Sequence, residues 1–311
     1  RLKVARGEVA ILNWETTKDD LVTVEMDQDI GDLTGATEFG VGRLEVPVTQ
    51  DATYTITARR GDESVTAQVS ITAAEGIGPG WYLFDDFELW EEGLILGASQ
   101  GYWGEPDSTG VTVVSDGGNK AITYSEGNPY TFTRLESFET RDSESRTLFC
   151  RVKFANDQVG TSFHFGATNK PLRFVGDLDA NLGGYVAITR EDGDDNATVA
   201  VGGGAGEETE FELLPGIWYK VWVDVTNSPG DAVDTVSIHV LEEGGASRTT
   251  LVEDADGDRG TLAPHTLLYL AARGSASTEG GSLLVDSVFV SRDGVLDTDP
   301  LDTDDPNLAM R

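Results

Sequence analysis

Cysteine, methionine and histidine are all scarce in this chain of 311 residues. It has one Cys, two Met and three His. A single Cys excludes an internal disulfide and a zinc site built on thiolates, and three His leave little material for a histidine-based metal site. Cys150 stands in the apolar stretch 147–152, which predicts a strand with a small buried thiol.

Basic residues are also few. Lys and Arg number 22 against 55 Asp and Glu, which gives a formal net charge of −33. Such a surface repels nucleic-acid phosphates and anionic membranes, so neither is expected as a partner. No run approaches the roughly 18 apolar residues of a membrane-spanning helix, and membrane insertion is therefore not expected. The acidic excess is compatible with plain solubility and with Ca²⁺ binding, and both interpretations stay open.

Short strands and turns dominate the first part of the chain. Alternating or β-branched stretches at 8–14, 21–26 and 42–48 are followed by a predicted hairpin, 53–58 and 64–71. Strands at this spacing, with turn residues between them, predict a small β-sandwich over residues 1–75.

This first region resembles the immunoglobulin-like modules of bacterial surface proteins. The resemblance is carried by Trp14 on an early strand, by the segment 52–58 (ATYTITA) and by a closing strand at 65–71. These are core and turn residues without chemistry of their own. The resemblance therefore implies a spacer or a docking platform.

Three further segments complete the predicted organisation. Residues 76–80 (GIGPG) read as a short linker, because Gly and Pro punctuate the chain there. Residues 81–293 contain recurrent strands without helical periodicity, which predicts a jelly roll. Residues 294–311 form an acidic tail or linker that contains Pro and has too few apolar residues for a core. The predicted fold class is all-β, a small Ig-like sandwich followed by a large jelly-roll sandwich.

The large domain resembles the concanavalin A-like and laminin-G-like domains. The resemblance rests on Phe84–Glu88, on 216–225 (GIWYKVWVDV) and on Leu284–Val290, which occur in the order of that family. It implies that the first and last strands pair. Its members include lectins, carbohydrate-binding modules, adhesion domains, glycoside hydrolases and lyases.

A structural Ca²⁺ is expected from acidic residues on these terminal strands. Asp86 and Glu88 are two residues apart on the predicted first strand and hence share a face. Asp286 lies on the predicted partner strand, and in the resembling sandwiches acids near these strand ends bind Ca²⁺. The alternative is that these carboxylates cap turns or face solvent.

Aromatic residues supply the candidates for ligand binding, because sugar C–H faces stack on rings. Tyr102 and Trp103 lie between glycines in a predicted loop, which either contacts a ligand or covers the end of the sandwich. Tyr185 lies on a predicted strand. Trp218 and Trp222 share a face with polar Lys220 and Asp224. The opposite residues of that strand are apolar and are expected to face the core, although the inverse assignment stays open.

These observations predict a secreted, cell-surface-associated protein that binds a polysaccharide or cell-surface glycan, or acts in adhesion, without catalysis. One alternative is a structural subunit of a filament, sheath or surface layer that self-assembles. A second alternative is a polysaccharide lyase or glycoside hydrolase, centred on His164, Tyr185 and Arg173. No residue spacing typical of a catalytic acid pair or triad occurs in the large domain, so catalysis is the less favoured interpretation.

Overall fold

The computed structural model describes most of the chain. It describes residues 2–5, 9–17, 22–38, 40–74, 80–88, 90–94, 110–124, 130–134, 140–141, 143–154, 161–168, 182–190, 196–201, 208–228, 234–256, 269–275, 283–291 and 293–301. Within these ranges the regular structure is all strand except for one short 3-10 helix, η1 (Thr34–Ala36). The predicted all-β class is confirmed. None of the described helical structure is long and apolar enough to span a membrane.

The chain divides into two compact units. Unit 1 contains Arg1–Phe84 together with Thr298–Arg311, and unit 2 contains Asp85–Asp297. The division lies a few residues after the predicted linker 76–80, inside strand β9 (Trp81–Asp85). Each unit is built from two β-sheets.

Unit 1 has a five-stranded and a three-stranded sheet. The first has the order β1-β8-β7-β3-β4 and the second the order β2-β6-β5. Their buried side chains, such as Trp14, Val24 and Ile71, form the core of the unit. A two-sheet unit is thus present, while its immunoglobulin-like kinship stays a prediction. The strands are β1 (Leu2–Ala5), β2 (Val9–Glu15), β3 (Thr23–Met26), β4 (Gly31–Asp32), β5 (Thr37–Glu38), β6 (Val41–Pro47), β7 (Ala52–Arg60) and β8 (Glu63–Ala74).

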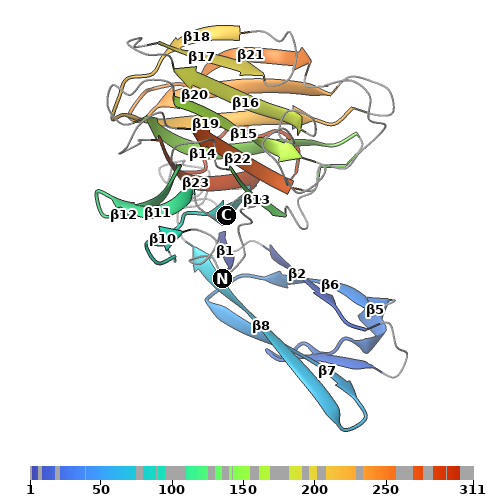
Figure 1. The fold of residues 1–311 in the computed structure, drawn as a ribbon. Helices are drawn as coiled ribbons and strands as arrows, with labels where there is room; N and C mark the ends of the chain where they lie inside the picture. Colours follow the sequence, from blue (N-terminus) through green and yellow to red (C-terminus); the bar gives the residue numbers. More distant parts are fainter. Residues whose placement is uncertain are drawn as a thin grey trace. The chain divides into compact units, whose positions relative to one another are not determined.

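The longest element of unit 1 is the hairpin β7–β8, which projects beyond the other strands of the unit (Figure 1). Its two-residue turn contains Gly61, whose φ of +59° is the left-handed value that hairpin turns require. The pairing runs without a register shift from Arg60↔Glu63 to Ala52↔Ile71. The predicted hairpin around residues 60–63 is therefore present with this register.

Unit 2 is a sandwich of a nine-stranded and a six-stranded sheet. The larger sheet has the order β10-β11-β12-β23-β14-β19-β20-β21, with β9 also pairing β23. The smaller has the order β13-β22-β15-β16-β17-β18. The strands are β10 (Gly93–Leu94), β11 (Val111–Asp116), β12 (Asn119–Tyr124), β13 (Tyr130–Arg134), β14 (Ser145–Phe154), β15 (Thr161–Thr168), β16 (Leu182–Arg190), β17 (Asn196–Val201), β18 (Glu208–Glu212), β19 (Trp218–Thr226), β20 (Thr235–Glu242), β21 (Thr249–Asp256), β22 (Tyr269–Ser275) and β23 (Leu283–Ser291).

The pairing of β9 with β23 agrees with the predicted pairing of the first and last strands of the large domain. The limits of the first strand differ, however. It ends at Asp85, and Phe87 follows with a left-handed φ of 57°. Asp86 and Glu88 therefore lie in the turn after the strand, and the prediction that both stand on one strand face is wrong.

The core of unit 2 lies between its two sheets. The inner residues of the large sheet include Val221 and Val223 on β19, and those of the small sheet include Phe163 and Phe165 on β15; all four are at most 1% exposed. Cys150 lies on the same inner side of β14, in register with Val221, and is fully buried. Burial, and secondarily the charge of Asp286, raise the pKa of its thiol well above the usual value.

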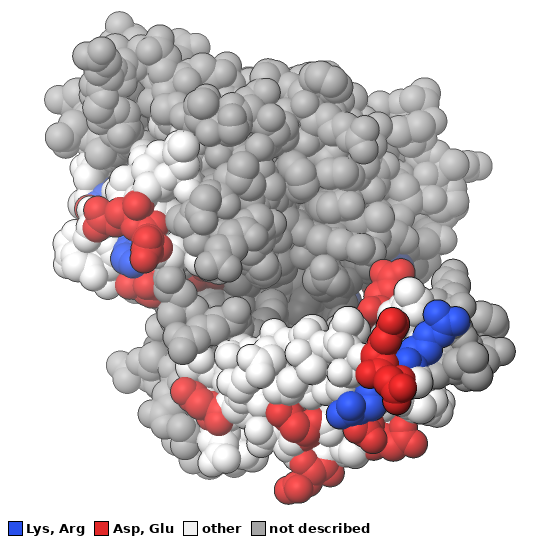
Figure 2. Space-filling view, turned by 60° about the horizontal axis from the view of Figure 1, so that its bottom comes forward, with Lys and Arg blue, Asp and Glu red and all other residues white. Residues whose placement is uncertain are grey.

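Acidic side chains dominate the charged surface that the structure describes. Figure 2 shows Asp and Glu in separate groups on one face, with Lys and Arg beside only some of them. On this face the described acidic groups therefore lie at several separate places.

Candidate functional site

Strand β19 has one apolar and one mixed face. Tyr219, Val221, Val223 and Val225 are at most 1% exposed and point into the sandwich. The remaining positions carry Trp218, Lys220, Trp222 and Asp224 on the outer face of the nine-stranded sheet. This division is the one predicted from the alternation, because successive side chains of a strand point to opposite faces.

Trp218 is half-buried and lies against two basic groups from the neighbouring strand β14. The Cζ atom of Arg151 is 4.6 Å and the Nζ atom of Lys153 is 5.0 Å from the centroid of its ring. The register places Lys153 directly opposite Trp218 and Arg151 opposite Lys220. Both distances are within the range in which a cation is attracted to the negative face of an indole.

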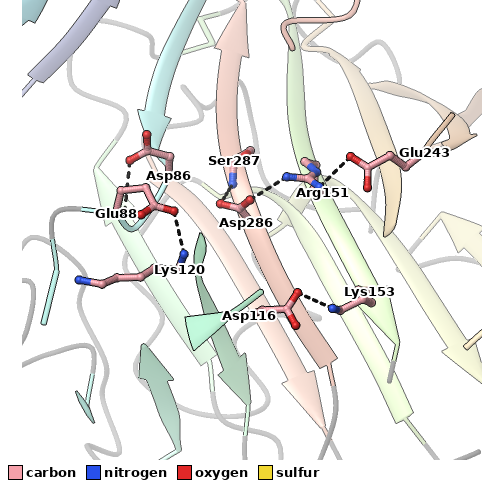
Figure 3. Close-up of polar contacts among 9 residues, drawn as sticks. All are labelled: Asp86, Glu88, Asp116, Lys120, Arg151, Lys153, Glu243, Asp286 and Ser287. Carbon is pink, nitrogen blue, oxygen red and sulfur yellow. Dashed lines mark hydrogen bonds and ion pairs between the residues drawn. The ribbon is translucent and has the colours of Figure 1, made fainter. Parts of the chain in front are cut away.

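The two basic side chains are in turn held by carboxylates from three other segments (Figure 3). Arg151 Nη1 donates to Asp286 Oδ2 at 3.0 Å, and Nη2 donates to Glu243 Oε1 at 2.8 Å. Lys153 forms an ion pair with Asp116. We call these six residues the Trp218 cluster: Asp116, Arg151, Lys153, Trp218, Glu243 and Asp286.

A β-bulge delivers Asp286 to this cluster. Between Phe149↔Phe289 and Arg151↔Asp286, strand β23 contains one residue more than β14. Ser287 adopts a left-handed φ of 53° in this stretch, and its N–H donates to Asp286 Oδ1 at 2.6 Å. The extra residue places both Asp286 and Phe289 on the outer face, which strict alternation would not allow.

The carboxyl group of Asp286 has an unusual affinity for protons. Burial raises its pKa to about 6, although the guanidinium of Arg151 and the hydrogen bonds from Ser287 lower it. The charge of Asp86 raises this pKa further. Only 7% of the Asp286 side chain is exposed, so desolvation outweighs the single ion pair.

Each of the predicted calcium ligands accepts a hydrogen bond from a protein donor. Asp86 Oδ1 accepts from the backbone N–H of Glu88 at 3.4 Å, and Glu88 Oε1 accepts from that of Lys120 at 2.7 Å. Asp286 is engaged by Arg151 (Figure 3). In the part of the chain that the structure describes, no group of three or more His, Cys, Asp or Glu is arranged to hold a metal ion. Asp86 thus caps the turn after β9, which is the alternative that the sequence left open.

Trp222 lies on the outer face but offers no open ring. It is 1% exposed, with Phe149 edge-on at 5.0 Å and the Arg248 guanidinium 5.9 Å from its ring centroid. At 1% exposure its ring is not accessible to a sugar. Of the two tryptophans predicted on this face, Trp218 alone presents a partly exposed side chain.

Beside Trp222 lies a buried series of hydrogen-bonded polar side chains. The alternation of apolar and polar residues in the sequence does not reveal it. Asp224 accepts from Thr147 Oγ1 at 2.6 Å and lies 3.0 Å from His239 Nε2. The other ring nitrogen of His239 is 2.9 Å from Thr250 Oγ1. His239 is on the outer side of β20, as predicted, but is 7% exposed. Each of its ring nitrogens has a partner, which is how a buried imidazole is tolerated.

The other predicted site residues are placed less completely. Tyr102, Trp103 and Arg173 lie outside the described residues. For Tyr185 the structure gives the backbone, which lies in β16 opposite Gly166. His164 lies opposite Ala187 in the same pair of strands, so the backbone positions of His164 and Tyr185 belong to one face of the six-stranded sheet.

Sequence reasoning missed four members of the Trp218 cluster. Arg151 and Lys153 alternate with buried Val152 and Phe154, which was a usable signal for a charged outer face on β14. Glu243 and Asp116 carried no such signal, because each lies in or beside a turn and reaches the cluster through pairing between strands.

The fold and this site define an all-β sandwich protein with a half-buried tryptophan held among paired charges on the outer face of its large sheet. No protein-family model matches the sequence, and no curated protein matches it. Similarity is found among solved structures. The globular domain of T. cruzi calreticulin has 11% identity and a TM-score of 0.42, covering 66% of this chain and 88% of that domain.

Two further structures have similar values. The potassium-bound carbohydrate recognition domain of Emp46p has 10% identity and a TM-score of 0.40, with 68% of this chain and 98% of that one covered. Xylan β-1,4-xylosidase from Bacillus halodurans C-125 has 10% identity and a TM-score of 0.41, with 78% and 51% covered. These likenesses concern the arrangement of strands and assign no activity to this chain.

Proposed function

We propose that the protein is a non-catalytic, extracellular glycan-binding protein whose unit 2 binds sugar at the Trp218 cluster. The observation that carries the proposal is the half-buried Trp218, with Arg151 and Lys153 at 4.6 and 5.0 Å from its ring centroid. An aromatic face beside fixed donors and acceptors is the usual composition of a sugar subsite.

The charges of the cluster favour a neutral glycan. Two cations are paired with three carboxylates, so the cluster carries no excess positive charge for a uronate or sulfate group. The chain as a whole has a net charge of −33, which repels acidic polysaccharides. The proposed ligand is therefore a neutral polysaccharide, whose hydroxyl groups pair with the carboxylates and the guanidinium.

The binding does not require calcium in this proposal. Asp86, Glu88 and Asp286, the residues predicted to hold Ca²⁺, each accept a hydrogen bond from a protein donor. Binding measured with EDTA and with added CaCl₂ is expected to agree. Binding that depends on calcium would instead support the ion site predicted at these three residues. It would not contradict a role for Trp218.

Affinity electrophoresis on a panel of neutral polysaccharides tests the proposal. We expect the protein to be retarded by at least one of them, and Trp218→Ala to lose most of the retardation while Trp218→Phe keeps part of it. Leu214→Ala, an exposed position in the loop before β19, is the matched control and should bind as the unchanged protein does.

Two results would contradict the proposal. One is the absence of retardation by every polysaccharide tested. The other is unchanged binding by Trp218→Ala in a protein whose far-ultraviolet circular dichroism is also unchanged. Release of unsaturated or reducing sugar products from the polysaccharides would instead favour the lyase or hydrolase alternative.

A further inference from the structure

The series of polar side chains beside Trp222 ends at an exposed hydroxyl group. Asp224 and His239 are 8% and 7% exposed, whereas Thr250 is an exposed residue of β21. Thr250 Oγ1 lies 2.9 Å from His239 Nδ1, and Asp224 Oδ2 lies 3.0 Å from His239 Nε2. A hydroxyl at the surface is thus joined through one imidazole to a buried carboxylate.

The partners of the carboxylate fix the direction of these hydrogen bonds. Thr147 Oγ1 accepts from the backbone N–H of Leu296 at 2.9 Å and donates to Asp224 Oδ1 at 2.6 Å. Because a carboxylate oxygen only accepts, His239 Nε2 donates to Asp224 Oδ2 and Nδ1 remains an acceptor. Thr250 Oγ1 therefore donates to Nδ1, which is the direction in which an imidazole removes a proton from a hydroxyl group.

A β-bulge in β21 sets Thr250 opposite this imidazole. Ile238 pairs with Val252, and the next residue of β20, His239, pairs with Thr250. Leu251 is therefore an extra residue on β21, and without it His239 would stand opposite Leu251. Bulges re-aim single side chains and are over-represented beside active sites.

A positive charge lies on the same face of the sheet. The guanidinium of Arg248 is 5.9 Å from the ring centroid of Trp222. Trp222, His239 and Thr250 follow one another directly across three neighbouring strands. Among the described residues, Arg248 Nη1 has no hydrogen-bond partner. A cation near a nucleophile stabilises the negative oxygen that forms when a carbonyl carbon is attacked.

We infer that Thr250 is a nucleophile that takes the acyl group of an ester, with His239 as its base and Asp224 as the residue that positions the imidazole. An exposed nucleophile, a base within hydrogen-bond distance and a third group that orients the base are the parts of a catalytic triad. The buried carboxylate stabilises the imidazolium that forms when Nδ1 takes the proton.

The step needs only the ester and the chain. Thr250 Oγ1 forms a bond to the carbonyl carbon of the ester, and His239 Nδ1 takes the hydroxyl proton. The bond from that carbon to the alcohol oxygen of the ester then breaks, and the leaving oxygen takes the proton from Nδ1. The products are the free alcohol and an acyl ester of Thr250.

This acylation is separate from the proposed glycan binding. None of the residues that carry it belongs to the Trp218 cluster. The transfer of one acyl group to each chain is stoichiometric and blocks the hydroxyl of Thr250. It is a modification of the chain, and the non-catalytic binding proposed above does not depend on it.

Incubation of the full chain with p-nitrophenyl acetate tests the inference. We expect a rapid release of one p-nitrophenolate per chain, and peptide mass spectrometry should place the acetyl group on Thr250. Thr250→Val, which has the same shape without the hydroxyl, should lose both signals, and Thr250→Ser should keep them. His239→Gln should slow the release by about 100-fold or more, because the base is removed.

A neighbouring threonine provides the matched control. Thr249 is also exposed but pairs with Val240, so Thr249→Val should be acetylated as the unchanged chain is. Asp224→Asn should slow the acetylation and alter its dependence on pH, which a purely structural role of Asp224 would not do. Acetyl groups found only at residues other than Thr250 would overturn the inference, as would equal acetylation of Thr250→Val. Retardation of Thr250→Val by polysaccharide should be unchanged, which separates this test from that of the glycan site.

Discussion

Strands β14 and β8 are both long and rich in apolar residues, yet their surroundings are opposite. β14 pairs with β19 from Ser145 to Lys153 and with β23 from Leu148 to Phe154, and every residue from Arg146 to Cys150 is buried. Among the described residues, β8 pairs with β7 from Glu63 to Ile71 and with β1 from Ile71 to Ala74, and it is exposed from Glu63 to Gln68. Burial of a strand thus depends on cover for both its edges and both its faces, and its composition alone does not decide it.

The two strands also differ in the charges that they carry. β14 contains three basic residues, Arg146, Arg151 and Lys153, each with a carboxylate nearby. The exposed stretch of β8 contains one charged residue, Glu63. Charged groups in a covered strand need partners, because desolvation would otherwise make them costly. The basic side chains of the covered strand are therefore held by carboxylates.

Removing a large side chain from β14 should have the greatest effect. Phe149 is 0% exposed and contacts Trp222 and Phe289 edge-on. Phe149→Ala leaves a cavity among these rings and should lower the free energy of unfolding of unit 2 by about 3–5 kcal/mol. Urea denaturation followed by tryptophan fluorescence measures this loss. A loss below about 1 kcal/mol would show that this side of the sheet is not closely packed.

The acid in the bulge beside β14 should make stability depend on pH. The pKa of Asp286 in the folded chain, about 6, lies above its value of about 3.9 in an unfolded chain. Between these values the folded state binds the extra proton, so stability falls as pH rises from about 4 to about 6 and stays low above that. The contribution is roughly 3 kcal/mol at most, because the two pKa values differ by about two units and each unit corresponds to about 1.4 kcal/mol.

Asp286→Asn is the variant that isolates this contribution. Urea denaturation of the unchanged protein and of Asp286→Asn at pH 4, 5, 6 and 7 should show a smaller decline in stability for the variant over this interval. Identical pH profiles would mean that the pKa of Asp286 is nearly the same in the folded and the unfolded chain, with Arg151 offsetting burial.

The smallest effect is expected on the exposed stretch of β8. Val65 is 71% exposed, so Val65→Ala should change the free energy of unfolding of unit 1 by no more than about 0.5 kcal/mol. The measurement belongs at the lowest protein concentration that gives a usable signal, because association would add to the apparent stability. A loss comparable to that of Phe149→Ala would mean that Val65 is covered in solution.

Local alternation predicted a large share of the fold. The strands at 53–58, 64–71, 218–225 and 284–290 are present, and Val221 and Val223 face the core as expected. The pairing of the first and last strands of the large domain was also correct. Period-two patterns report which face a residue occupies, and these segments carry such patterns clearly.

The candidate site was less predictable, because it depends on long-range register. Trp218 was predicted from the sequence. Arg151, which lies over its ring, and Glu243, which pairs with Arg151, come from other strands and turns that are distant along the chain. The bulge at Ser287 has no Gly to announce a left-handed backbone, and it places Asp286 opposite Arg151. Trp222 was expected on the outer face and is there, but Arg248, from the turn before β21, lies over its ring.

Cys150, at the centre of β14, has a consequence for the chemistry of the protein in an oxidising medium. The thiolate is the form that attacks disulfides and oxidants, and burial suppresses it here by raising the pKa of the thiol. The folded chain is therefore inert toward mixed-disulfide formation. Cys150 becomes reactive only when β14 separates from its neighbours. The rate of thiol labelling would therefore report the rate at which the large sheet opens.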